Sequence, residues 1–87
     1  MTLSRFGTII GKFLIEQRNG RVRRCQFPDV VFAAPEGQHD VDTVIVGCGP
    51  NSERARLDLI SKIHGKVARR YVHGRRLEFP VPNSLTP

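Results

Sequence analysis

The pattern of apolar and polar residues at the start of the chain predicts a bent first strand. Residues 5–17 are rich in β-branched and aromatic side chains and are interrupted by Gly7 and Gly11. Glycines inside a strand often mark a bulge or a sharp bend. Alternate positions place apolar side chains on both faces of this strand. Such a strand is buried on both sides or binds something on one of them, so a stacking surface or self-association as a homo-oligomer is expected.

A second strand is expected to pair with the first through a hairpin. Asn19-Gly20 is the strongest short-range signal for a two-residue hairpin loop. The strand after it begins at Val22 and continues through Phe27. Pro28-Asp29 then predicts a bulge or a corner, after which strand character resumes over residues 30–34.

A third strand and a helix follow. Residues 41–46 have strand character, and the glycine-rich residues 47–50 end them. Apolar spacing then predicts a helix over roughly Ser52 to Ile63, capped by Asn51 or Ser52 and ended by His64-Gly65. The apolar face of this helix consists of Ala55, Leu59, Ile60 and Ile63.

A second hairpin closes the chain. Residues 66–72 and 75–81 are predicted as two strands joined by a His73-Gly74 turn. Residues 82–87 contain two prolines and show no periodicity, so we expect a flexible C-terminal tail there. The folded part is therefore expected to be one domain over residues 1–81.

The resulting order, β-β-β-α-β-β, is that of the OB-fold. This mostly β fold is a five-stranded, partly open Greek-key barrel, here with one helix between strands three and four. Residues 63–67 and 74–79 resemble the fourth and fifth strands of small single-stranded-DNA-binding proteins of the SSB and PriB kind. The resemblance implies an oligonucleotide-binding face on strands two and three, and it transfers no individual functional residue. The alternative is an unrelated small α+β sheet with one helix packed on it.

Charge narrows the class of partner. Fourteen Lys and Arg against eight Asp and Glu give a net charge of +6 in 87 residues. Such a surface attracts polyanions, of which nucleic acid is the commonest. Eleven of the fourteen basic residues are Arg, which contacts phosphate through two N–H groups and stacks on bases. Arg also pairs with carboxylates, so a basic inhibitor or interaction protein docking on an acidic protein surface is the alternative function.

The basic residues gather around the two predicted hairpin turns, where aromatic rings lie nearby in the sequence. A groove that binds single strands combines Lys and Arg for phosphates with rings that stack on bases. Phe27, Phe32 and Tyr71 are the candidate rings, although the core is the more frequent place for each of them, because a domain this small has few other large residues to fill its barrel. The predicted nucleic-acid-binding residues are Arg18, Arg21, Arg23, Arg24, Phe27, Arg69, Arg70, Tyr71, Arg75 and Arg76.

No motif makes a strong case for catalysis, a cofactor or a metal. Cys48 to Arg54 has the Cys-x5-Arg spacing of a cysteine-phosphatase loop, but Glu53 would repel the incoming phosphate and the chain is too short for the supporting parallel sheet. Residues 44–52 imitate a dinucleotide-binding turn, yet Ser52 replaces its third glycine. The cysteines and histidines lack metal-ligand spacing. We therefore expect a protein that is not an enzyme.

The N-terminal residues indicate the compartment. Residues 1–17 include Arg5, Lys12 and Glu16 and lack the uninterrupted apolar core of a signal peptide. No apolar run approaches the roughly twenty residues that span a membrane. We expect a cytoplasmic protein, with Cys25 and Cys48 reduced.

Overall fold

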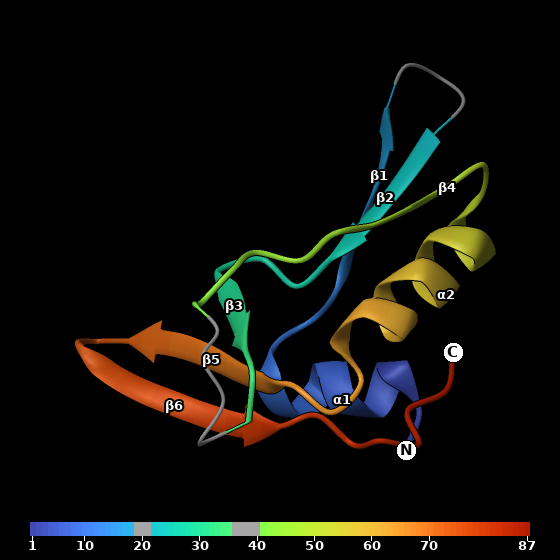
Figure 1. Cartoon of the computed structure of the whole chain (residues 1–87). Helices are drawn as coiled ribbons and strands as arrows, with labels where there is room; N and C mark the ends of the chain where they lie inside the picture. The colour runs from blue at the N-terminus through green and yellow to red at the C-terminus, as the bar shows by residue number, and fades with distance from the viewer. Residues whose placement is uncertain (19–21, 36–40) are drawn as a thin grey trace.

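The computed structural model describes residues 1–18, 22–35 and 41–87. The described strands form two antiparallel sheets of three strands each, in the orders β1-β2-β4 and β3-β5-β6 (Figure 1). These sheets do not close into the expected five-stranded barrel, and a second helix is present. In chain order the elements are α1 (Leu3–Ile10), β1 (Leu14–Arg18), β2 (Val22–Gln26), β3 (Val30–Ala33), β4 (Gly47–Gly49), α2 (Ser52–Ile63), β5 (Val67–Val72) and β6 (Arg75–Pro80).

The start of the chain is a helix, so the strand predicted over residues 5–17 is wrong in its first half. The buried residues of α1 recur with helical spacing and face the core. The side chain of Thr2 caps the helix by accepting a hydrogen bond from the Arg5 N–H at 3.2 Å. Gly11, with a φ of 117°, ends the helix before β1 begins. The buried residues of α1 are Leu3, Phe6, Gly7 and Ile10.

The first hairpin and the corner after it are confirmed. β1 pairs antiparallel with β2, from Leu14 opposite Gln26 to Arg18 opposite Val22. The predicted Asn19-Gly20 turn lies outside the described residues. At Pro28-Asp29 the chain leaves the first sheet and enters the second, and Asp29 makes the sharp change of direction with a φ of 60°.

The third predicted strand, over residues 41–46, is wrong. Within it only Thr43 forms a bridge, exchanging backbone hydrogen bonds of 2.8 and 2.9 Å with Phe32. The strand that joins the first sheet is instead β4. It forms from the glycine-rich residues that were expected to end the predicted strand. A Cβ at Gly47 would lie 2.3 Å from the Ala55 carbonyl oxygen and one at Gly49 would lie 2.7 Å from the Ala55 N. Glycine is required there because β4 contacts the backbone of α2 directly.

Helix α2 has the predicted limits. The Asn51 side chain caps it by accepting a hydrogen bond from the Arg54 N–H at 2.9 Å. The predicted apolar face is buried: Leu59 and Ile63 are 0% exposed, as is Ala55, and Ile60 is 5% exposed. Burial of this face against the sheets gives a short helix the stability that its own hydrogen bonds do not provide.

The second hairpin is also confirmed. β5 and β6 pair from Val67 opposite Pro80 to Val72 opposite Arg75, leaving His73-Gly74 as the loop. Both loop residues have positive φ, 50° and 77°, as the type I′ turn of a twisted hairpin requires.

The C-terminal residues are packed against the domain, unlike the flexible tail expected over residues 82–87. Leu85 is only 3% exposed, and its carbonyl oxygen lies 2.9 Å from Nε2 of His64. The Leu3 N–H donates to the Thr86 carbonyl at 2.7 Å, so the two ends of the chain lie side by side (Figure 1). Burial of the Leu85 side chain holds this segment in place.

The outer edge of β4 is bonded to side chains of α2. The Cys48 N–H donates to Oδ2 of Asp58 at 2.8 Å, and Nζ of Lys62 donates to the Val46 carbonyl at 3.0 Å. Asp58 and Lys62 also form an ion pair of 2.8 Å. The hydrogen bond from Lys62, followed by that from Cys48, lowers the pKa of Asp58 below its ordinary value of 3.8.

We predict that Gly47→Ala destabilises the protein by about 2 to 4 kcal/mol, because the added methyl forces α2 away from β4. Gly74→Ala is the matched control. Its methyl meets no atom within 4 Å, so only the positive φ of 77° opposes it, at about 1 to 2 kcal/mol. Urea unfolding followed by circular dichroism measures both. Equal losses in the two variants would contradict the close contact between β4 and α2.

We predict that Asp58→Asn lowers the free energy of unfolding by about 1 kcal/mol at neutral pH, a modest value because solvent screens this partly exposed carboxylate. The folded-state pKa of Asp58 is lowered, so its stabilisation is present above the ordinary value of 3.8 and is lost as pH falls through the lower folded-state value. The difference between variant and wild type in urea melts should therefore shrink in acid. A difference independent of pH would contradict the role given to this carboxylate.

Candidate functional site

Tyr71 is the aromatic side chain that the structure leaves most open. It is 59% exposed on β5, directly opposite Arg76 of β6. The other two candidate rings, Phe27 and Phe32, are 2% and 1% exposed and belong to the core. Neither of these two rings is available to stack on a base, so the stacking role expected of Phe27 does not agree with its burial, while that of Tyr71 stays a prediction.

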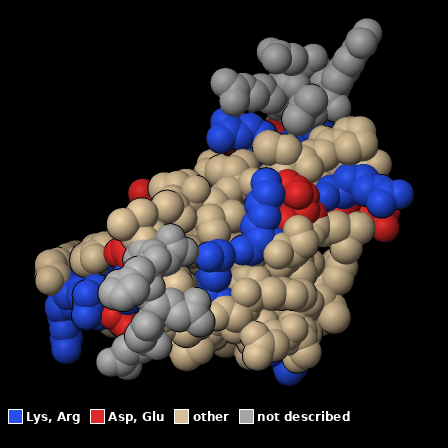
Figure 2. All heavy atoms as spheres, viewed as in Figure 1, with Lys and Arg blue, Asp and Glu red and all other residues tan. Residues whose placement is uncertain are grey.

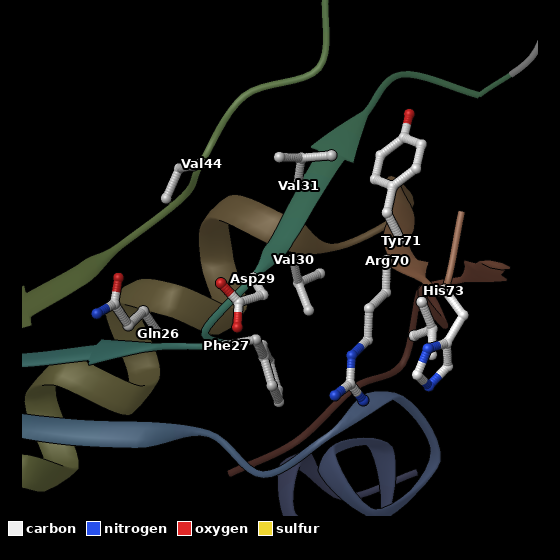
Figure 3. A pocket seen from close by; sticks show the side chains of 10 residues that line it. Gln26, Phe27, Asp29, Val30, Val31, Val44, Arg70, Tyr71 and His73 are labelled. Carbon is white, nitrogen blue, oxygen red and sulfur yellow. The ribbon is translucent and has the colours of Figure 1, made fainter. Parts of the chain in front are cut away.

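A hollow of about 640 Å³ lies where the two sheets meet (Figure 3). β5 extends beyond its last pair with β3, Arg70 opposite Val30, and Tyr71 and Val72 in this extension line the hollow together with Asp29. Valine side chains supply apolar walls, and Gln26 and Asp29 add an amide and a carboxylate. The hollow therefore offers both a surface for a flat apolar group and hydrogen-bonding groups for its edge.

Arg70 lines this hollow and also stabilises helix α1. Its Nη1 donates to the Ile10 carbonyl at 3.1 Å, at the C-terminal end of the helix where the dipole favours a cation. Gly11 leaves room for the guanidinium, since a Cβ there would lie 3.1 Å from Nη1. In Figure 3 Arg70 points toward α1 with His73 beside it, and Tyr71 points to the other side of β5.

The neighbouring arginines of the second hairpin are paired with carboxylates. Arg69 forms a hydrogen-bonded ion pair with Asp42, and its Nε lies 3.4 Å from Oε1 of Glu78. Nε of Arg76 lies 2.9 Å from the same Glu78 oxygen. The positive charge on this face of β5 and β6 is therefore largely balanced. Arg75, at the hairpin end, has no ion pair among the described residues and is exposed.

Two described basic residues of the first hairpin, Arg23 and Arg24, do not lie on one face. Arg23 and Arg24 are adjacent on β2 and therefore point to opposite faces of the sheet. Arg21 and the side chain of Arg18 lie outside the described residues. On the side of the molecule that Figure 2 shows, Lys and Arg form several separate groups, and acidic side chains lie beside some of them. The predicted set therefore does not form one cluster among the described residues.

Sequence reasoning missed the part of the site at the corner. Gln26, Asp29, Val44 and His73 line the hollow, yet none was a candidate. The Pro28-Asp29 corner was a usable signal, because a chain that changes sheets leaves a gap between them. That Val44 completes the wall depends on a long-range approach that the sequence pattern does not indicate.

The cysteines do not form a phosphatase-like site. Gly47 and Gly49 face α2, so alternation places the Cys48 side chain on the opposite side of β4 from Arg54. The Cys48 N–H, which a phosphate would need, is bonded to the Asp58 carboxylate. Cys25 is fully buried, and burial raises the pKa of its thiol from 9.0 to about 11, against a smaller opposing effect of Arg56.

Comparison with known proteins identifies no relative: no family model, no curated protein and no solved structure matches the chain. Within residues 1–18, 22–35 and 41–87, no three or more His, Cys, Asp or Glu side chains gather as metal ligands would. Neither described helix is long and apolar enough to cross a membrane.

Proposed function

We propose that the protein is a non-enzymatic module that binds single-stranded nucleic acid at the end of the β5–β6 hairpin. The observation that carries this proposal is the exposed ring of Tyr71 beside Arg76 and the hollow at the sheet junction. Exposed rings next to cations are what single-strand binding requires, because every base can stack and every nucleotide carries a phosphate.

The residues around the Tyr71 ring would contact different parts of the bound strand. A base stacked on Tyr71 could reach the hollow with its edge, where Gln26 and Asp29 offer donors and acceptors. Arg75 and His73 lie at the hairpin end, where phosphates on either side of that base would pass. Since the charge of Arg76 is already paired with that of Glu78, stacking would contribute more to affinity than charge does.

Docking on an acidic protein surface is the second candidate function. Val41 and Val44 are 73% and 65% exposed, and Val44 lines the same hollow as Tyr71. An exposed apolar side chain such as Val44, lining the same hollow as a ring and a cation, resembles the centre and rim of a protein interface. A protein partner would bury these valines, whereas a nucleic acid would use the ring and the cations.

We predict that Tyr71→Ala weakens binding of a labelled oligonucleotide by about 1 to 3 kcal/mol, because the stacking surface is lost. Tyr71→Phe keeps the ring and should bind nearly as the wild type does. Fluorescence anisotropy measures both affinities, and circular dichroism confirms that both variants are folded. If Tyr71→Ala binds as tightly as the wild type, the ring is not the binding surface.

We predict that Arg75→Gln flattens the dependence of log K on log salt by about 0.7, the contribution of one neutralised phosphate of a single strand. Tyr71→Ala should leave the slope nearly unchanged, because stacking releases few ions. Anisotropy titrations at two salt concentrations give the slopes. Absence of any binding to single-stranded DNA or RNA at low salt and micromolar protein would reject this function in favour of a protein partner.

A further inference from the structure

Strand β6 forms an outer edge of its sheet. It is paired only with β5 among the described strands, and Figure 1 shows it along the border of the molecule. Two other sheet edges are bonded: Asp58 and Lys62 occupy the edge of β4, and Thr43 bridges Phe32 of β3. An unpaired edge is a template for another strand.

The hairpin geometry identifies the backbone groups of β6 that face outward. In a two-residue turn the Arg75 N–H bonds to the Val72 carbonyl, so Arg75 directs its backbone groups toward β5. In an antiparallel pair this direction alternates along the strand. Arg76 and Glu78 therefore direct their N–H and C=O groups outward. Pro80 has only a carbonyl to offer, which ends the usable edge there.

Only three registers would let two copies of this edge exchange hydrogen bonds between outward-facing residues. One places Arg76 opposite Arg76 of the second copy, and another places Glu78 opposite Glu78; both set like charges face to face. The third places Arg76 opposite Glu78 of the second copy, twice over. It uses all four outward-facing groups of Arg76 and Glu78 in each chain.

The third register also matches the apolar side chain between the two charges. Leu77, 40% exposed, would lie opposite Leu77 of the second copy at a pair without hydrogen bonds, where side chains come closest. Arg76 and Glu78 are 57% and 39% exposed and already lie within 2.9 Å of each other in one chain. Their charges alternate along the edge, so a copy turned by 180° meets each charge with its opposite.

We propose that β6 pairs antiparallel with β6 of a second copy of this chain, centred on Leu77, to form a symmetric dimer with one continuous six-stranded sheet. In a dimer with two-fold symmetry, both copies contribute the same surface patch to the interface. Because directly opposite residues share a face, both Tyr71 side chains would lie on one side of this sheet. The dimer does not depend on nucleic-acid binding.

Charge reversal tests the pairing. Arg76→Glu and Glu78→Arg each make the edge uniform in sign, so each variant alone should lose the dimer, with association weakened roughly tenfold or more. An equal mixture of the two should dimerise again, because an acidic edge then meets a basic one. Light scattering after size exclusion, over a concentration series, measures the mass, and circular dichroism confirms folding. Wild-type protein that stays monomeric at every concentration, or a mixture that does not associate, would overturn the proposal.

Cross-linking tests the register. In a Cys48→Ser background, Leu77→Cys should form an intermolecular disulfide under mild oxidation, since facing positions of this kind bring Cα atoms within disulfide range. Leu57→Cys, on α2 and with a similar 37% exposure at the native leucine, is the matched control and should remain reduced. Equal cross-linking of both variants would show random collision and contradict pairing at Leu77.

Discussion

Phe27 stands where the chain leaves the first sheet and enters the second, and its ring contacts three other aromatic rings. The centroid distances are 5.6 Å to Phe6 of α1, 6.3 Å to Phe13 before β1 and 6.4 Å to Phe32 of β3. The pairs with Phe6 and Phe13 are edge-to-face and the pair with Phe32 is tilted, and aromatic pairs of this kind add to the stabilisation from burial. One side chain thus joins both sheets and α1, and the hollow beside Tyr71 exists because the chain turns at this buried ring.

The close contact between β4 and α2 is a second way in which this small chain holds its elements together with few residues. Without side chains at Gly47 and Gly49 the strand lies directly against the helix, and Asp58 and Lys62 then occupy its free edge. An edge bonded in this way cannot recruit another strand. β6 has no such cover among the described residues, which is why the charge pattern of Arg76 and Glu78 decides what it can pair with.

Local signals predicted helix α2 and the pairing of both hairpins, and they failed at the N-terminal helix, at residues 41–46 and at the packed C-terminal segment. α2 and the β5–β6 hairpin carry caps and turn residues that act over a few positions. At the N-terminus the helical spacing of Leu3, Phe6 and Ile10 was present, but β-branched composition and two glycines favoured a strand. Residues 41–46 have strand composition, yet the strand formed at Gly47–Gly49 because only a glycine backbone fits against α2.

The candidate site was predictable only in part, because the state of each arginine depends on residues far away in the chain. Alternation alone implies that adjacent arginines on a strand face opposite sides. The groups that these arginines contact are distant in the sequence. Arg69 pairs with Asp42, 27 positions away, and Arg70 donates to the Ile10 carbonyl, 60 positions away. These contacts occupy guanidinium groups that a count of the fourteen Lys and Arg residues would treat as available to a ligand. Any anion that binds beside Tyr71 must therefore rely on the ring and on the few cations left at the hairpin end, so its affinity should be less sensitive to salt than the composition implies.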